Sequence, residues 1–300
     1  MQKQGKGDGG GGDNPAKLLC AVGDTCEVCG ARSTIHRCSK CRTARYCSVD
    51  CQASHWEDHK DYCQVLVRRR ELGVALYDAS RDGEEQKVPL LVSLGAEVGY
   101  KLEEQPNLGH FPLLTASSKG QEKVVRALLK AGAKPNQRGG QYSWSALFAA
   151  AQSNFPRIAC ILLAGGADIN LANYQGGTPL YIACSKNKLD VVKLLVRARG
   201  INVNQCAEDG FSPLHIATGE GDAEVVSVLL AAGSDVHLKT GDGFSALDVA
   251  IYYKHPAVIA LLLAHSAKQE GAEAAVKAEV GAVLSVLVLK VEVEVDAEGK

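Results

Sequence analysis

The strongest constraint on the fold is a sequence unit that recurs every 33 or 34 residues. Five leucines mark the unit, at Leu113, Leu147, Leu180, Leu214 and Leu247, with separations of 34, 33, 34 and 33 residues. A regular period in this range is typical of proteins in which each repeat buries its apolar face only against its neighbours. The sequence therefore predicts an elongated stack of small units instead of one globular core.

Each unit carries the start and stop signals of two helices. Serine or threonine stands two residues before most of the marker leucines, where its side chain can cap a helix, and proline often follows at the first helical position. Pro156 and Pro256 each open the second helix of their unit. Glycine then ends the second helices, because it reaches the left-handed conformation without steric cost. These glycines are Gly132, Gly166, Gly200 and Gly233.

Segments 178–183 and 212–217, Thr-Pro-Leu-Tyr-Ile-Ala and Ser-Pro-Leu-His-Ile-Ala, resemble the motif of ankyrin repeats. The resemblance implies a mostly α-helical solenoid of helix pairs with short hairpin loops over residues 72–267, in about six repeats. The first repeat, within 72–98, and the last are expected to depart from the pattern. The 37 residues between Leu76 and Leu113 predict an extra loop around 103–107. The resemblance also implies that His215 holds neighbouring backbone by hydrogen bonds.

The residue before each helix cap is expected on the returning arm of a hairpin, and several of these residues are aromatic. The series is His110, Trp144, Gly177, Phe211 and Phe244, with Tyr142 and Tyr174 nearby. Buried aromatic anchors dominate many protein interfaces. The predicted partner surface is therefore Tyr142, Trp144, Tyr174, Phe211 and Phe244, and the alternative is that these rings pack against adjacent hairpins.

A second feature is a cluster of cysteines near the amino end. Seven of the 11 cysteines and one histidine form four close pairs, namely Cys26 with Cys29, Cys38 with Cys41, Cys47 with Cys51, and His59 with Cys63. A two-residue gap lets a tight turn aim two sulfurs at one ion, and residues four apart share one face of a helix. Eight ligands fit two tetrahedral zinc ions, and with every position filled by protein the zinc is predicted to be structural.

So short a segment depends on metal for its folding, and its thiolates must stay reduced. We therefore expect the protein in the cytosol or the nucleus.

Residues 46–52, Tyr-Cys-Ser-Val-Asp-Cys-Gln, followed by Trp56, His59, Lys60 and Cys63, resemble the MYND zinc finger. The resemblance implies interleaved ligation, with Cys26, Cys29, Cys47 and Cys51 on one ion and Cys38, Cys41, His59 and Cys63 on the other. The spacing alone is equally compatible with sequential pairing, in which the first two ligand pairs in the chain bind one ion and the last two pairs bind the other. MYND fingers take short proline-containing peptides, and the matching contact positions are Ser48, Gln52 and Trp56. The alternative for Trp56 is a core aromatic in a very small domain.

The remaining segments complete the predicted organisation. Residues 1–22 form a disordered glycine-rich leader, 26–63 the zinc finger, 64–71 a helical linker, and 268–300 a tail of uncertain structure. The apolar run in the tail is too short to span a bilayer. Cys160 and Cys184 fall in apolar helical contexts and are predicted to be core residues.

We expect a scaffold protein in which both modules bind proteins, and no enzyme. The first alternative is an enzyme, because some MYND fingers accompany methyltransferase SET domains or prolyl hydroxylases. The second is a nucleic-acid-binding zinc protein, since nine basic residues against five acidic ones give the segment 26–70 a charge of 9 − 5 = +4. Seven thiolates and two zinc ions add −7 + 4 = −3, which leaves about +1 and argues against phosphate-driven binding.

Overall fold

The computed structural model describes residues 36–38, 40, 44–46, 49–102 and 109–270. The chain divides into two compact units, Met1–Arg68 and Arg69–Lys300. The predictions for the leader, for the loop around 103–107 and for the tail after residue 270 lie outside the described residues. Within the described ranges no helix is both long and apolar enough to cross a membrane. The described chain is mostly helical, and the predicted fold class is confirmed.

The first unit contains a small hairpin followed by helix. Strand β1 (His36–Arg37) pairs antiparallel with β2 (Arg45–Tyr46), and the Cys38 amide donates to the Ala44 carbonyl at 2.8 Å. Helix α1 (Val49–Ser54) follows, and α2 (Trp56–Asp82) begins two residues later. The buried core in the described part of this unit is small, formed by Cys38, Ala44 and Cys63. Residues 64–71 are helical, as part of α2.

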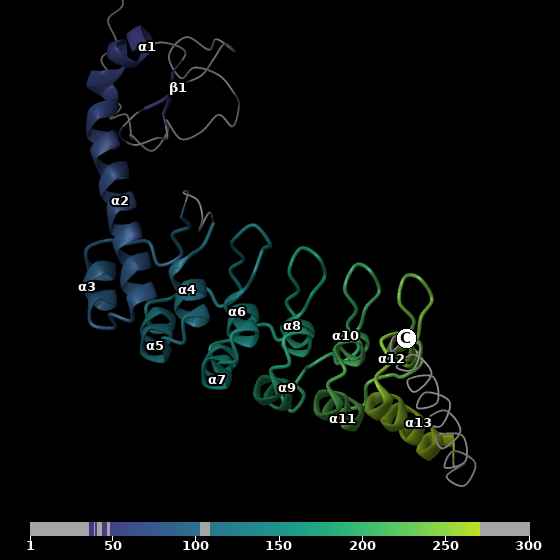
Figure 1. Cartoon of the computed structure of the whole chain (residues 1–300). Coiled ribbons are helices and arrows are strands. Elements are labelled where there is room, and N and C mark those ends of the chain that lie inside the picture. The colour runs from purple at the N-terminus through teal and green to yellow at the C-terminus, as the bar shows by residue number, and fades with distance from the viewer. Residues whose placement is uncertain (1–35, 39, 41–43, 47–48, 103–108, 271–300) are drawn as a thin grey trace, which may run out of the picture. The chain divides into compact units, whose positions relative to one another are not determined.

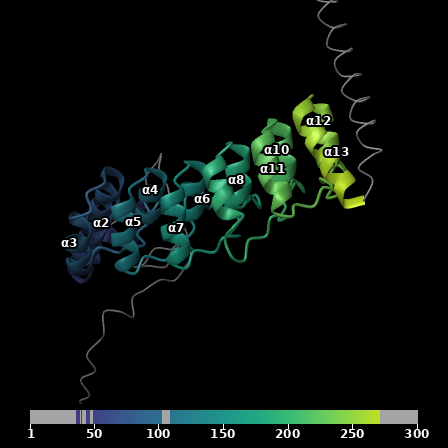
Figure 2. The ribbon, with the colours of Figure 1, turned by 90° about the horizontal axis from the view of Figure 1, so that it is seen from below.

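The second unit is a double row of helices. After the end of α2 and the short α3 (Lys87–Ser93), five helix pairs follow in chain order. They are α4 (Pro112–Ser118) with α5 (Glu122–Lys130), α6 (Ala146–Gln152) with α7 (Pro156–Ala164), α8 (Pro179–Ser185) with α9 (Leu189–Leu195), α10 (Pro213–Glu220) with α11 (Ala223–Ala231), and α12 (Ala246–Tyr252) with α13 (Pro256–Glu270). The first helices form one row and the second helices another, and the hairpins that precede α6, α8, α10 and α12 all lie on one side (Figure 1). Seen from below, the pairs succeed one another in chain order (Figure 2).

Most of the predicted helix signals are confirmed. Ser145, Thr178, Ser212 and Ser245 each accept a hydrogen bond from the backbone amide three residues later. Helix α4 differs, because buried Phe111 occupies its cap position and makes no side-chain cap. Gly132, Gly166 and Gly233 each stand directly after the C-cap residue of their helix, with φ between +86° and +89°. Gly200 stands four residues beyond Val196, the C-cap of α9. The caps and three of the four glycines therefore set the helix boundaries that the sequence indicates, and the prediction that Gly200 ends its helix is wrong, because α9 already ends at Leu195.

Each hairpin is tied to the next by a backbone hydrogen bond. Glu208 donates to the Gln175 carbonyl at 3.0 Å, and Gly241 donates to the Asp209 carbonyl at 2.9 Å. Tyr174 makes the same kind of bond to Tyr142 at 3.3 Å. The hairpin tips consequently form a continuous row in which neighbouring repeats fix one another's position.

A series of asparagines, here called the asparagine ladder, joins neighbouring repeats through side-chain hydrogen bonds. Asn136 accepts from the Asp168 amide at 2.7 Å and donates to the Gly166 carbonyl at 3.2 Å. Asn170 makes the equivalent bonds one repeat later, to Asn202 and Gly200, and Asn204 accepts from Asp235. These residues were missed in the sequence, although their 34-residue spacing follows the period of the repeat.

The core lies between the two rows of helices. Leu147, Leu180 and Leu214 are at most 1% exposed, and Cys184 is fully buried as predicted. The prediction for Cys160 is wrong, because that side chain is exposed. Helix α7 is apolar on almost every side, so its sequence does not indicate which face is buried. Its buried positions are Ile158, Ala159 and Leu162, and the helical period turns Cys160 away from them.

Candidate functional site

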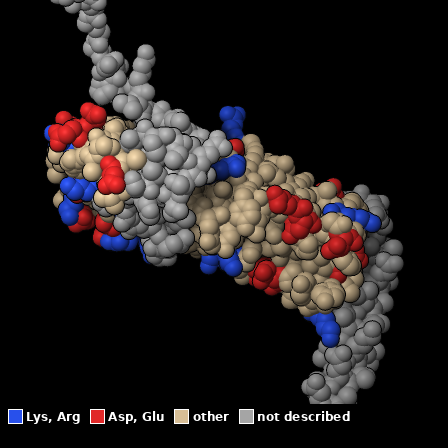
Figure 3. Space-filling view, turned by 90° about the horizontal axis from the view of Figure 1, so that it is seen from above, with Lys and Arg blue, Asp and Glu red and all other residues tan. Residues whose placement is uncertain are grey.

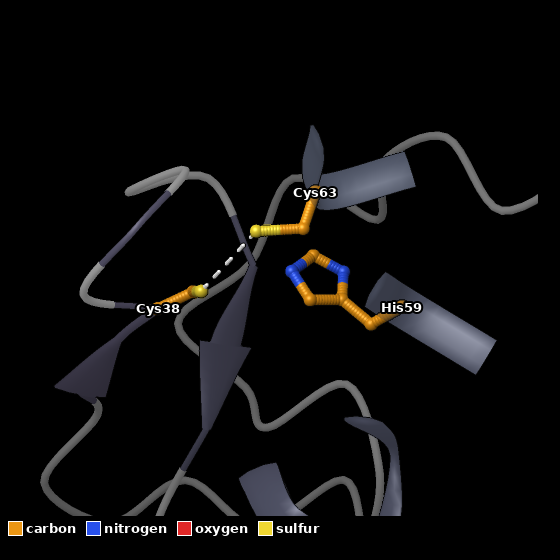
Figure 4. Close-up of side chains that lie close together, drawn as sticks. All are labelled: Cys38, His59 and Cys63. Carbon is orange, nitrogen blue, oxygen red and sulfur yellow. Dashed lines mark hydrogen bonds between the residues drawn. The ribbon is translucent and has the colours of Figure 1, made fainter. Parts of the chain in front are cut away.

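The metal centre combines one residue from the hairpin with two from a helix. Cys38 directly follows β1, whereas His59 and Cys63 stand one turn apart on α2. Their ligand atoms lie within 4.8 Å of one another, and all three residues are buried. Figure 4 shows the two sulfurs and the imidazole converging from these elements. His59 and Cys63, four residues apart on one helix, thus lie on the same face of that helix, as the sequence predicts.

The geometry of this cluster fits zinc. The sulfurs of Cys38 and Cys63 are 3.9 Å apart, which is far longer than the roughly 2.05 Å of a disulfide. Two thiolates bound to one tetrahedral zinc at about 2.3 Å would be separated by about 3.8 Å. Thiolate and imidazole are also the donors that zinc prefers. Cys41, the predicted fourth ligand, lies outside the described residues.

The grouping also bears on how the ligand pairs combine. Cys38 lies with His59 and Cys63, which is the combination that interleaved ligation implies. Sequential pairing would instead place Cys38 on the other ion. Cys51 is half-buried on α1, packs against the same small core and is outside this three-residue group. Cys26, Cys29 and Cys47, its predicted co-ligands, fall in the undescribed part of the chain.

One of the three predicted peptide contacts, Trp56, is shown to border the metal centre. Trp56 begins α2, is half-buried and packs against the core around Cys38 and Cys63. The ammonium of Lys40 lies 5.1 Å from the centre of its ring, within the range of a cation–π contact. Gln52 on α1 is half-buried, and Ser48 lies outside the described residues. Trp56 therefore packs on the core and is also partly accessible.

On the repeat unit, three of the five predicted aromatic contacts form one stack. Tyr142 lies between Trp144, at a ring distance of 5.5 Å, and Tyr174, at 5.7 Å with planes 9° apart. Trp144 stacks in turn on Phe148 of α6 at 5.7 Å. The stack agrees with the alternative that these rings cover one another, yet Tyr174 remains 48% exposed. It is thus both packed and open to a partner.

The other two predicted contacts lie outside the stack. Phe211 meets the ring of His215 edge-on at 6.0 Å, and Phe244 is 52% exposed. The structure therefore separates the five residues into one cluster and two single sites.

A groove opens beside the stack over α6 and α8. Its volume is about 540 Å³, and its lining includes Trp144, Phe148, Gly177 and Tyr181 together with Glu208 and Asp209 from the next hairpin. Burial, assisted by the negative charge of Asp209, raises the pKa of Tyr181 to about 12. The phenol of Tyr181 is therefore neutral at physiological pH, and the two carboxylates give the groove its negative charge.

His215 on α10 holds backbone from two repeats, as predicted. Its Nε2 lies 3.1 Å from the Leu238 carbonyl, which can only accept, so Nε2 carries the proton. Its Nδ1 accepts from the Ser212 amide at 3.2 Å and completes a capping box with that serine. Burial lowers the pKa of His215, which favours this neutral form. The residue is structural and lies outside the lining of the groove.

Comparison with family models agrees with both units. The model for ankyrin repeats matches in three copies, at residues 76–173, 147–240 and 200–277, which together span more than half of the chain. The chain belongs to the ankyrin-repeat family. The model for the MYND finger matches residues 26–63 of this ankyrin-repeat chain. MYND fingers bind zinc, and both modules mediate protein–protein interactions, so the chain joins two interaction modules.

The matches to curated proteins cover only the zinc finger of this chain. Ubiquitin carboxyl-terminal hydrolase 19 of Arabidopsis thaliana is 43% identical over 61 residues, which cover 19% of this ankyrin-repeat chain and 9% of the hydrolase. Histone-lysine N-methyltransferase SMYD3 of Homo sapiens is 44% identical over 45 residues, 15% of this chain and 10% of its own. Egl nine homolog 1 of Homo sapiens is 38% identical over 64 residues, 21% and 15% of the two chains. The chain thus spans less than a sixth of each of these relatives.

Proposed function

We propose that the protein is a non-enzymatic adaptor that holds two protein partners at once. The zinc finger takes a short proline-containing peptide, and the hairpin face of the ankyrin repeats takes a second protein. Two binding sites on one chain raise the effective concentration of one partner near the other. The observation that carries the proposal is the stack of Tyr174, Tyr142 and Trp144, whose rings are held in place but remain partly exposed beside a groove.

The zinc finger is proposed to hold two structural zinc ions with interleaved ligands. Cys38, Cys41, His59 and Cys63 bind one ion, and Cys26, Cys29, Cys47 and Cys51 bind the other. Burial of Cys38, His59 and Cys63 supports a structural role, because a catalytic zinc needs a position open to water or substrate. The bound metal would fix the hairpin against α2 and thereby hold Trp56 and Gln52 in place for a peptide.

We infer that the peptide lies along Ser48, Gln52 and Trp56. Gln52 offers both a donor and an acceptor to a peptide backbone, and Trp56 offers an aromatic surface on which a proline ring can pack. The thiolate ligands require reducing conditions, so we place the protein in the cytosol or the nucleus. The methyltransferase-type alternative has little support, because similarity to named enzymes is restricted to the finger.

Binding to the finger is tested with an array of proline-containing peptides probed with the zinc-loaded full chain. Trp56→Ala and Gln52→Ala are expected to lose the bound peptides. Gln64→Ala makes the same chemical change at an exposed position of α2 and should keep them. Peptide binding that survives both changes at the predicted face contradicts the assignment.

Binding to the repeats is tested by isolating complexes with the full chain and identifying the bound protein. Tyr174→Ala should release it, whereas Tyr252→Ala, which removes a 77% exposed tyrosine outside the groove, should not. Methyl transfer to any captured protein by the purified chain would overturn the non-enzymatic part of the proposal.

A further inference from the structure

The groove lies in the repeat that has glycine at a position where three other repeats have an aromatic residue. The position before the first-helix cap holds Trp144, Phe211 and Phe244 in three repeats, but Gly177 in the repeat between Trp144 and Phe211. Gly177 is itself buried in the floor of the groove. A Cβ at this position would lie 3.5 Å from Cδ1 of Tyr181 and at least 3.3 Å from its other neighbours. A Cβ would thus just fit, and the groove of about 540 Å³ lies beside the position where the other repeats carry a ring.

One wall of the groove is aromatic and rigid. Trp144 is fixed between Tyr142 and the buried Phe148, with planes 24° and 18° from its own. Because these rings are nearly parallel, their faces stack against one another. They form a flat wall and not a cage that surrounds a cation from several sides.

Another part of the groove lining is acidic and, among the described residues, has no counter-charge. Glu208 and Asp209 are both exposed, and no lysine or arginine of the described chain pairs with either. One Asp209 oxygen accepts from the Phe211 amide at 3.1 Å, which fixes the carboxylate and leaves its second oxygen available. The face toward which the hairpins project carries groups of acidic side chains on the repeat unit (Figure 3). The groove thus attracts a cation.

Other groups of the lining suit an extended peptide. Tyr181 is half-buried and lines the groove together with Asp209, and no other ring of the described chain stacks on it. The side-chain amides of Gln152 and Gln175 line the groove without a hydrogen bond to any described residue. Each amide can donate to and accept from a peptide backbone.

We propose that this groove binds an arginine side chain presented by an extended segment of a partner protein. This inference rests on the adaptor function proposed above and specifies the chemistry of the second partner. The guanidinium pairs with the carboxylates of Asp209 and Glu208 while its plane stacks on Tyr181, and its apolar stem packs along Trp144. Arginine suits the site better than lysine, because its planar fork can bind two acceptors and stack at the same time.

The test uses the zinc-loaded full chain and pools of fluorescent nine-residue peptides. Each pool has one fixed central residue, namely arginine, lysine, trimethyl-lysine, glutamate or leucine, and neutral residues elsewhere. Anisotropy titrations give the apparent affinity of each pool. The arginine pool is expected to bind at least roughly 10-fold tighter than the leucine pool, as a charge-assisted pair with stacking should.

Three variants locate the binding. Gly177→Phe restores the ring found at Phe211 and Phe244, and its backbone has no positive φ, so it should fold and lose the arginine pool. Asp209→Asn keeps the acceptor for the Phe211 amide and should weaken binding roughly 10-fold. Asp242→Asn removes the equivalent charge from the next hairpin, outside the groove, and should leave binding within about twofold. Thermal unfolding checks that all three fold.

Two results would overturn the inference in different ways. If the trimethyl-lysine, lysine, glutamate or leucine pool binds best and Gly177→Phe abolishes it, the arginine assignment fails while the adaptor function stands. If a folded Gly177→Phe keeps the arginine pool, the groove is not its site. Loss of the captured partner on Tyr174→Ala would show independently that the repeats still bind a protein.

Discussion

The two units of this protein are held together by different means. The described core of the first unit has three buried members, two of which are predicted zinc ligands. The second unit has two large apolar clusters that continue from one repeat to the next. We therefore expect stability in the first unit to depend on metal, and stability in the second to be a sum of contacts between neighbouring repeats. Each of the following changes is expected to affect one unit and spare the other.

Metal removal should have the largest effect, and only on the first unit. A structural zinc site contributes on the order of 10 kcal/mol to folding at neutral pH, far more than a core of three residues can replace. Chelation, or Cys63→Ser, is expected to abolish amide-exchange protection around α1 and the Trp56 end of α2. Protection in α6 to α11 should stay unchanged. Equal loss of protection in both units would refute the comparison, and intact protection around Trp56 would refute the metal dependence.

In the second unit, the contacts between neighbouring hairpins can be disrupted by replacing one glycine with alanine. Gly210 and Gly200 have the same φ, 80° and 81°, but a Cβ on Gly210 would lie 2.5 Å from the Gly241 backbone nitrogen, and one on Gly200 would meet nothing within 4 Å. Gly200→Ala should therefore cost only about 1–2 kcal/mol for its left-handed conformation. Gly210→Ala adds a clash between hairpins and should cost about 2–5 kcal/mol in total.

Urea unfolding of the two glycine variants measures this difference directly. Both changes should leave the zinc finger's peptide binding intact, because they act on the repeats alone. Similar costs for Gly210→Ala and Gly200→Ala would show that the hairpin row contributes little to coupling between repeats.

The pH dependence of unfolding should come from buried histidines of the second unit. Burial lowers the folded-state pKa of His215 below its unfolded value of about 6.5. The stability due to its neutral form is thus complete above about pH 6.5 and is lost as the pH falls through that value, at up to about 1.4 kcal/mol per pH unit. His215→Leu should flatten part of the slope between pH 7.5 and 5.5. His110, whose pKa burial also lowers, should supply part of the remainder. An unchanged slope in His215→Leu would exclude the effect.

How far the sequence could predict each unit follows from the range of the interactions involved. Caps such as Ser212, the glycines that directly follow α5, α7 and α11, and the pairing of His59 with Cys63 all depend on residues within one or two turns. These were predicted correctly. The grouping of Cys38 with His59 joins a hairpin to a helix, so spacing left it open. The exposure of Cys160 depends on which side of an apolar helix meets the next repeat, and composition cannot reveal that.

The groove shows the same limit for function. The series of residues before the caps pointed to aromatic contacts and included Gly177 as its exception. Only the structure shows that Trp144 from one repeat and Asp209 from another line the same groove as Gly177. The asparagine ladder, by contrast, was available in the sequence through the equal spacing of Asn136, Asn170 and Asn204, and was missed because asparagine carries no apolar signal.

The smallest expected effect concerns Ser143, which stands between the two stacked rings Tyr142 and Trp144. Its φ is +55°, whereas the equivalent positions in the next three hairpins are glycines with φ between +79° and +86°. A non-glycine residue in this region carries strain of about 1–2 kcal/mol, and such strain is often found at binding sites. Ser143→Gly should relieve it, although the greater freedom of glycine in the unfolded chain offsets part of the gain.

The matched control is Ser143→Ala, which keeps the Cβ in the left-handed conformation. Ser143→Gly should therefore be more stable than Ser143→Ala by roughly 1 kcal/mol in urea unfolding. It should also bind the arginine pool less tightly than wild type, because the link between Tyr142 and Trp144 becomes more flexible and the aromatic wall is less well preorganised. Equal stability of the two variants would mean that Ser143 is unstrained. Greater stability with unchanged binding would mean that the rings, and not the backbone between them, fix the wall of the groove.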